Sequence, residues 1–499
     1  MSTYSHAYDG AMPAMPRRKR LRAALFGSLS LWLVLAMLIG ISIAIYDGLN
    51  RDYIADIDAL NLAEALTYEA HQAAWLFAGL TLPLMLLHGR KMRFSIPESI
   101  FLWFMLCTAA YSKDFAYMKV PGAPIYVTDV TLAIVTLGTF IWPRLRIPKP
   151  TSRVMLPVAA FLLLGAVNGV RGIQNHGAII DVLRDVSVTV YSLFMLAGLY
   201  AKRRKALVEQ FFLMILCGAI MATLVGIGWY LAHPGMRRYV EVQSYVALAF
   251  MLVTIAILGK RLSPLAGVPL LLLLAYGVIL SNARTVYVGM GLGFGLLLLT
   301  GLGKLKMKDV LKFGGIAFLV LAIVFVALLQ TREGSQYARR VVDELIQGFL
   351  HPSGDDNAQW RLLAWAEAGR RFLTQPVIGE GYGLPFTFEL ASMDIKPHNI
   401  YLYVLYKTGL VGFSIFLWLL IVPTLAAWRA MRKYKEHPDA LAIRALFVCQ
   451  IFFFCWGALN PLIETPFLAS MFWLNFGLML HTARQMERDS NALVSAAAA

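Results

Sequence analysis

Charged residues are scarce in this chain of 499 residues: they make up 15% of the sequence, against 59% for hydrophobic residues. A soluble globular domain is typically about 25% charged and about 45–50% apolar. No long polar segment remains for a separate soluble domain, except residues 330–397. Apolar runs close to the ~20 residues that cross a bilayer recur along the whole chain. The composition therefore predicts a polytopic membrane protein.

The sequence also lacks the cysteine patterns of disulfide frameworks and zinc sites. Its four cysteines, Cys107, Cys217, Cys449 and Cys455, all lie inside apolar runs, and no CxxC or CxxH spacing occurs. We therefore expect neither a disulfide framework nor a metal site, and no cofactor is predicted. The net charge of +16 does not indicate nucleic-acid binding, because the basic residues are spread among short loops between the apolar runs.

The apolar runs predict an all-α fold with about 12–14 transmembrane helices. The first run follows the basic stretch RRKRLR and is longer than the roughly 7–15 residues of a signal-peptide core, so we expect it to be retained. The candidate spans are residues 23–45, 70–88, 95–111, 124–142, 154–168, 186–200, 207–232, 239–258, 265–281, 285–302, 311–329, 399–427, 443–458 and 464–482. Residues 265–302 also fit a hairpin.

The distribution of basic residues predicts the orientation of these spans. With the N-terminus in the cytoplasm, every short cytoplasmic loop is basic, as the positive-inside rule requires, and most of the 45 Lys and Arg residues lie on that side. Both termini are then cytoplasmic. The predicted organisation is a basic tail (1–22), transmembrane helices 1–11 (23–329), a large periplasmic loop with short helices (330–397), helices 12–14 (398–483) and a cytoplasmic tail (484–499).

The large loop contains a predicted helix. Residues 355–357, Asp-Asp-Asn, are favourable helix N-caps, and the residues after them favour helix until Pro376 ends it. Arg361 and Trp365 are spaced i, i+4, so they share one face of this helix. The helix thus presents a cation and an indole ring on the same side.

A glycine-rich stretch, G-E-G-Y-G, follows the proline and contains Gly379, Gly381 and Gly383. Similar spacing occurs in nucleotide-binding fingerprints, but these require a strand before the glycines and a helix after them. Neither is predicted here, and the stretch lies outside the cell in the predicted topology. We therefore interpret it as a tight structural turn.

Polar and charged residues gather where several spans meet the outer membrane surface. Arg284 interrupts the apolar sequence 265–302, and an arginine at membrane depth costs roughly 2.5–3.5 kcal/mol on insertion scales, so it usually lines a polar cavity. Arg184 lies at the mouth of a span, where it either takes part in a site or pairs with Asp181 at i, i+3. Glu464 lies on the outer lip of the last span.

The sequence KPHNIYLYVLYKTG places His398 and Asn399 on the lip of another span, with Lys407 about two turns deeper. Lys407 either faces a cavity, which we favour, or extends its amine toward the headgroups. An isolated histidine here would be a helix-cap or interface residue, but arginines in the same layer favour a site. Arginine binds phosphate through a planar fork of donors, and a histidine near its unperturbed pKa of ~6.5 acts as a base. This set suits a lipid-linked phosphate or diphosphate donor.

These motifs, in this order, resemble the O-antigen ligase and O-antigen polymerase superfamily of bacterial membrane glycosyltransferases. The resemblance rests on S-N-A-R at 281–284, the Arg-x-x-x-Trp pair at 361 and 365, P-V-I-G-E-G-Y-G at 376–383, and P-H-N-I-Y-L at 397–402 with Lys407-Thr408-Gly409 after it. It covers about residues 245–425. The earlier segments fit only in general hydropathy.

The resemblance implies an inverting, metal-independent glycosyl transfer at the periplasmic face of the inner membrane, with an undecaprenyl-diphosphate-linked glycan as donor. Arg284 and Arg361 would bind the donor diphosphate, and His398 would activate or position the acceptor hydroxyl. Asn399 would hold the loop or a sugar hydroxyl. We also assign Trp365, Arg184 and Lys407 to substrate binding on our own interpretation, and Glu464 to the acceptor side.

The sequence leaves the reaction open among four alternatives, of which a protein-glycan ligase is disfavoured by the short C-terminus. A polymerase of O-antigen or exopolysaccharide repeat units is favoured by the chain length and the number of spans. A ligase would instead transfer the finished glycan to lipid A–core. A transporter or flippase for lipid-linked polysaccharide is disfavoured, because the charged residues gather at one face and the spans are otherwise mostly apolar. The expected partners are the lipid-linked glycan, a glycan or lipid A–core acceptor, and membrane lipids, with no nucleic acid.

Overall fold

The computed structural model describes residues 30–50, 72–116, 118–119, 126–141, 152–175, 177–200, 204–232, 243–281, 283–300, 356–388 and 396–498, with isolated positions between 315 and 339. Within these ranges every regular element is an α-helix. Seven of the helices are long and apolar enough to cross a membrane. The prediction of an all-α polytopic membrane protein is therefore confirmed.

The helices follow the predicted apolar runs closely. They are α2 (Leu31–Asn50), α4 (Gln72–Lys91), α5 (Ile96–Ala116), α6 (Val127–Ile141), α7 (Ser152–Gln174), α8 (Ile179–Val190), α9 (Leu193–Leu199), α10 (Arg204–Ala232), α11 (Gln243–Leu258), α12 (Pro264–Ser281), α13 (Arg284–Thr300), α16 (Asp356–Thr374), α17 (Ile400–Lys433), α18 (Ala440–Leu459) and α19 (Pro466–Ala498). The basic tail 1–22 and most of the predicted span 311–329 lie outside the described residues. The helix predicted before Pro376 is present as α16.

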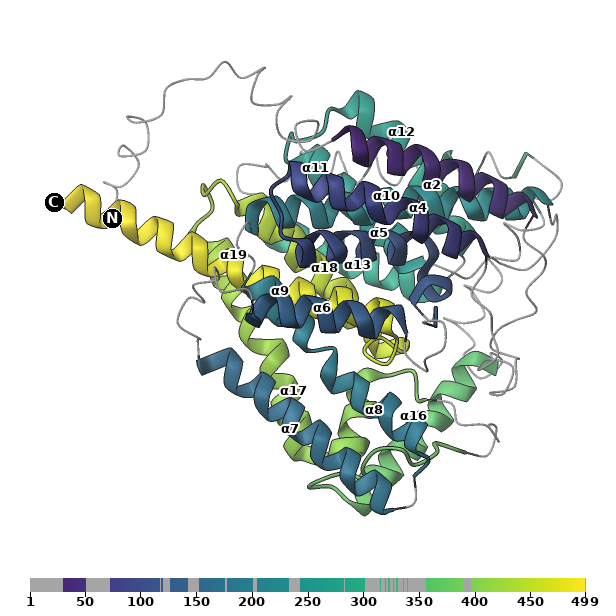
Figure 1. The fold of residues 1–499 in the computed structure, drawn as a ribbon, viewed down its shortest axis with the longest axis vertical. Helices are drawn as coiled ribbons and strands as arrows, with labels where there is room; N and C mark the ends of the chain where they lie inside the picture. Colours follow the sequence, from purple (N-terminus) through teal and green to yellow (C-terminus); the bar gives the residue numbers. More distant parts are fainter. Residues whose placement is uncertain are drawn as a thin grey trace.

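Two of the predicted spans differ from the observed helices. The predicted span 186–200 is divided into α8 and α9 at Tyr191 and Ser192, where hydrogen bonds from Ser192 N to Thr189 O and from Phe194 N to Tyr191 O have the i→i+3 pattern of a tightened turn. At the other end of the chain, α19 continues far beyond residue 482. Its C-terminal part projects from the bundle (Figure 1).

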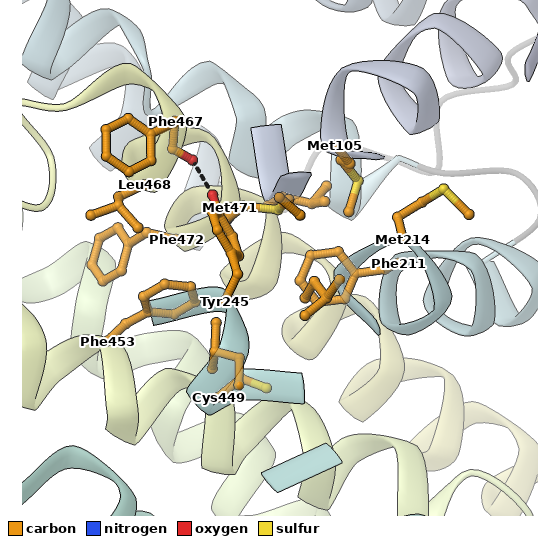
Figure 2. Close-up of a cluster of buried hydrophobic side chains, with 14 of the residues drawn as sticks. Met105, Phe211, Met214, Tyr245, Cys449, Phe453, Phe467, Leu468, Met471 and Phe472 are labelled. Carbon is orange, nitrogen blue, oxygen red and sulfur yellow. Dashed lines mark hydrogen bonds between the residues drawn. The ribbon is translucent and has the colours of Figure 1, made fainter. Parts of the chain in front are cut away.

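The bundle is built around a buried core of aromatic and sulfur-containing side chains from α5, α10, α11, α18 and α19. Figure 2 shows Tyr245 in this core with its hydroxyl directed at the main chain of α19, where it donates to Phe467 O over 2.6 Å. A buried hydroxyl costs free energy unless it is hydrogen-bonded, so this contact fixes α11 against α19.

Helices α7, α8, α16 and α17 form a separate group beside this core (Figure 1). Helix α17 packs against α7 and α16, and α7 packs against α8. Helix α17 also packs against α18 and α19, which connects the group to the core. The residues that the sequence singles out on the large loop and on the lip of α17 all belong to this group.

Candidate active site

A break in α17 provides the main-chain groups to which the glycine-rich turn binds. Gly409 has φ 65° and ψ −168°, so the helix is interrupted there. The interruption frees the carbonyls of residues 406 and 407 and the amides of residues 410 and 411 from their normal i→i+4 partners. The turn 376–381 satisfies all four groups: Glu380 N donates to Tyr406 O, Gly381 N to Lys407 O, Leu410 N to Pro376 O and Val411 N to Val377 O. The glycine-rich turn and the helix break are therefore one unit.

Glycine is required on both sides of this contact. Gly379, Gly381 and Gly383 all have positive φ, as Gly409 does. A Cβ on Gly379 would collide with the main chain of Lys407, and a Cβ on Gly409 would collide with that of Val377. The turn thus uses glycine for backbone conformation and close approach, and residues 384–388, the described residues after it, contain no helix.

We expect Gly379→Ala to destabilise the protein strongly. A non-glycine residue at positive φ costs roughly 1–2 kcal/mol, and the collision with Lys407 adds to that cost. The control is Gly369→Ala in α16, because a Cβ at Gly369 meets open space and alanine favours helix by about 1 kcal/mol over glycine. Thermal unfolding of the detergent-solubilised proteins measures both. Equal melting temperatures for the two variants would contradict the close contact.

Helix α7 holds the same turn from the other side. Arg171 donates from Nη1 to Asn168 Oδ1 (2.7 Å) and Ile378 O (3.0 Å), and from Nη2 to Gln375 Oε1 (3.1 Å) and Gly379 O (2.9 Å). A guanidinium satisfies several carbonyls at once because its donors are fixed in one plane. The turn is therefore held on two sides, by α7 and by α17.

A buried carboxylate on α8 links this turn to the start of α17. Asp185 Oδ2 accepts a hydrogen bond from Gly383 N (2.9 Å), and Oδ1 accepts from Tyr403 Oη (2.6 Å) and Lys396 Nζ (3.0 Å). Lys407 Nζ lies 3.4 Å from Oδ2. Asp185, Glu380, Lys396, Tyr403 and Lys407 form what we call the ionic cluster.

Charge in the ionic cluster is closely balanced. Lys407 has only 2% of its side chain exposed; its Nζ lies 2.9 Å from Glu380 Oε1 and donates to Leu384 O. Arg371 of α16 lies 3.4 Å from Glu380 Oε2 and also donates to Pro385 O. Buried charges are tolerated when they are paired and hydrogen-bonded. Every charge of the ionic cluster is paired, and Glu380 Oε1 meets Lys407 as an ion pair without a hydrogen bond.

The same contacts keep Asp185 ionised. Burial alone would raise the pKa of the Asp185 carboxyl. The two ammonium groups and the two hydrogen bonds outweigh burial, so the pKa is lowered below its usual range. At neutral pH the carboxylate is therefore a permanent acceptor for the groups around it.

His398 lies at the junction between the large loop and α17. Its φ is 49°, a conformation that is uncommon for a residue other than glycine. Trp365 Nε1 donates to Pro397 O (3.0 Å), and the Trp360 ring lies 4.8 Å from the imidazole between centroids. Asn399 caps α17 by accepting from Tyr401 N and Leu402 N. The backbone of His398 is thus fixed from both sides, as a strained conformation requires.

The structure brings several predicted residues together. Trp365 contacts the residue before His398, and Arg361 lies on the same helix, next to Trp360. Arg184 and Lys407 line one small pocket of about 10 Å³, together with Asp181, Asp185, Leu384, Lys396, Tyr403 and Tyr406. The Arg184–Asp181 pair that we gave as an alternative is present at 3.5 Å, with both side chains partly exposed.

Two predicted residues lie on neighbouring elements. Arg284 is the first residue of α13, which packs mainly against α18 and α11. Glu464 lies in the turn between α18 and α19. Asn399 uses its side-chain oxygen for the helix cap.

Within the described ranges, no three His, Cys, Asp or Glu side chains gather as metal ligands.

Six residues around the site were not predicted from the sequence: Asp185, Glu380, Lys396, Tyr403, Arg171 and Arg371. One signal was available: Tyr403 and Lys407 are spaced i, i+4, so they share a face of α17. Asp185 lies one residue after Arg184, at the same span mouth. Lys396 precedes the Pro-His-Asn motif by one residue, but a single lysine in a loop gives no signal of its own.

The fold and site define a multi-pass membrane protein with a polar, largely paired charge cluster where the loop before α17 joins that helix. Residues 269–417 match the model of the family described as O-antigen ligase. This match confirms the resemblance of this part of the chain to the O-antigen ligase and polymerase superfamily. It indicates a glycosyltransferase-type enzyme acting on a lipid-linked glycan and an acceptor. No curated protein matches the chain by sequence.

Proposed function

We propose that this protein is an inner-membrane glycosyltransferase that takes its glycan from an undecaprenyl-diphosphate donor at the periplasmic face and polymerises O-antigen or exopolysaccharide repeat units. The observation that carries the proposal is the family match over residues 269–417. That segment contains Arg284, the helix with Arg361 and the fixed His398 junction. The basic loops on the opposite side support the predicted orientation.

The proposed reaction needs no cofactor. The acceptor hydroxyl gives its proton to His398, and its oxygen attacks the anomeric carbon of the donor sugar. The bond from that carbon to the diphosphate oxygen breaks, and undecaprenyl diphosphate leaves with the bonding electrons. Attack opposite the leaving group inverts the configuration. Arg284 and Arg361 stabilise the charge that develops on the diphosphate.

The remaining site residues serve binding and orientation in this proposal. Trp365 holds the main chain before His398, and Asn399 begins α17 immediately after it. Arg184 and Lys407 line the adjacent cavity, and Glu464 serves the acceptor side. An enzyme that holds two large substrates in a reactive orientation lowers the activation barrier of the transfer substantially.

The name of the matching family, O-antigen ligase, favours a second candidate, a ligase that transfers the glycan to lipid A–core. Both candidates use the same donor, so the lipid-linked pools in a deletion strain separate them. Single repeat units that accumulate on the carrier indicate a polymerase. Long polymer on the carrier together with unmodified acceptor indicates a ligase. Unchanged pools in the deletion strain would contradict both and favour transport.

A further inference from the structure

We propose that Asp185 is a positioning residue for this transfer, acting through Lys396 and Tyr403 to fix the His398 junction. The inference rests on the proposed function and adds a residue from outside the family match. Asp185 lies on α8, which comes well before residues 269–417 in the sequence. All four donors around its carboxylate nevertheless belong to that matched segment. Helix α8 therefore completes a site whose other parts lie elsewhere in the chain.

The contacts of Asp185 fall on both sides of His398 in the sequence. Lys396 comes two residues before the histidine and bonds to Oδ1, and Tyr403 comes five residues after it and bonds to the same oxygen. The Lys396 ammonium also lies 4.9 Å from the centre of the Tyr403 ring. A single carboxylate oxygen thus joins the two ends of the segment that contains the strained residue.

The remaining contacts tie this segment to the glycine-rich turn. Asp185 Oδ2 accepts from Gly383 N and lies near Lys407, whose carbonyl accepts from Gly381 N. The glycine-rich turn also forms main-chain hydrogen bonds with α17 on both sides of the break at Gly409. Because these bonds are buried and charge-assisted, they are stronger than neutral exposed ones. The Asp185 carboxylate therefore holds α8, the turn and the His398 junction in one arrangement.

Lys396→Met tests the role with little disturbance of the fold, because Asp185 keeps three other donors. In protein reconstituted with the lipid-linked donor, we expect kcat to fall about 10- to 100-fold, as for small displacements of reacting groups, with KM changed less than about threefold. Asp185→Asn should lower kcat at least as much. The control is Asp489→Asn, which removes a carboxylate paired with His437 on another element and should leave kcat unchanged.

A double variant separates positioning from a general loss of structure. If Lys396 acts through His398, then Lys396→Met combined with His398→Ala should have the residual activity of His398→Ala and no less. Losses that multiply, or a Lys396→Met enzyme with full kcat, would overturn the inference.

Hydrogen exchange gives a readout that does not depend on the reaction. Lys396→Met should speed amide exchange in the peptide 396–403 and leave α18 unchanged, because the lost contact is local. Unchanged exchange in 396–403 would refute the positioning role even in an active enzyme. Faster exchange in a protein whose wild type transfers no glycan would support the positioning and refute the proposed function.

Discussion

Replacing His398 by alanine is expected to lower the rate of glycan transfer by at least about 100-fold, the usual contribution of a general base. The protein should still insert and fold, because Asn399 retains the cap of α17 and Trp365 retains its bond to Pro397. Transfer is measured with purified protein and lipid-linked donor, at matched protein amounts and melting temperatures.

His398→Gln is the matched variant for this prediction. Glutamine fills a similar space beside Trp360 and forms hydrogen bonds, but it cannot accept the proton. We therefore expect it to be as inactive as the alanine variant. If glutamine restored most of the activity, His398 would act through packing or hydrogen bonding rather than as a base.

Lys407→Met is expected to have the largest effect on stability. Its ammonium lies within 3.4 Å of both Asp185 and Glu380 and is almost fully buried. Removing one partner of a buried ion pair typically costs about 3–5 kcal/mol, because a charge is left uncompensated. The melting temperature in detergent measures the loss. Lys435→Met, at an exposed position just after α17, is the control and should be nearly neutral.

A double-mutant cycle shows whether the loss comes from the ion pair. Glu380→Gln removes the nearest negative charge, so the double variant Lys407→Met with Glu380→Gln should be less destabilised than the sum of the single variants. Strict additivity would mean that the Lys407–Glu380 ion pair makes no contribution to the stability.

Hydropathy predicted most helix positions because a bilayer requires continuous apolar runs. The local backbone geometry inside those runs was harder to predict. Gly409 is one of many glycines in apolar sequence, and only its contact with the turn 376–381 shows why the helix breaks there. The division of 186–200 at Tyr191 likewise depends on local i→i+3 bonds that leave no trace in hydropathy.

The candidate site was predictable where motifs are local in sequence. Trp365, His398 and Asn399 come from two short motifs, and the structure places them next to one another. The partners that hold them were not predictable, because they depend on contacts between distant segments. Asp185 meets Tyr403 only through the packing of α7, α8 and α17, and no spacing rule connects residues so far apart in the chain.

The most direct test of the account is a transfer assay with wild-type protein and His398→Ala protein in liposomes that contain undecaprenyl-diphosphate-linked repeat units and acceptor. We predict that the wild-type protein releases undecaprenyl diphosphate and forms a new glycosidic bond, while the variant does neither at a comparable rate. Donor that binds the wild-type protein but remains intact would contradict glycosyl transfer. Equal product from both proteins would contradict the assignment of His398.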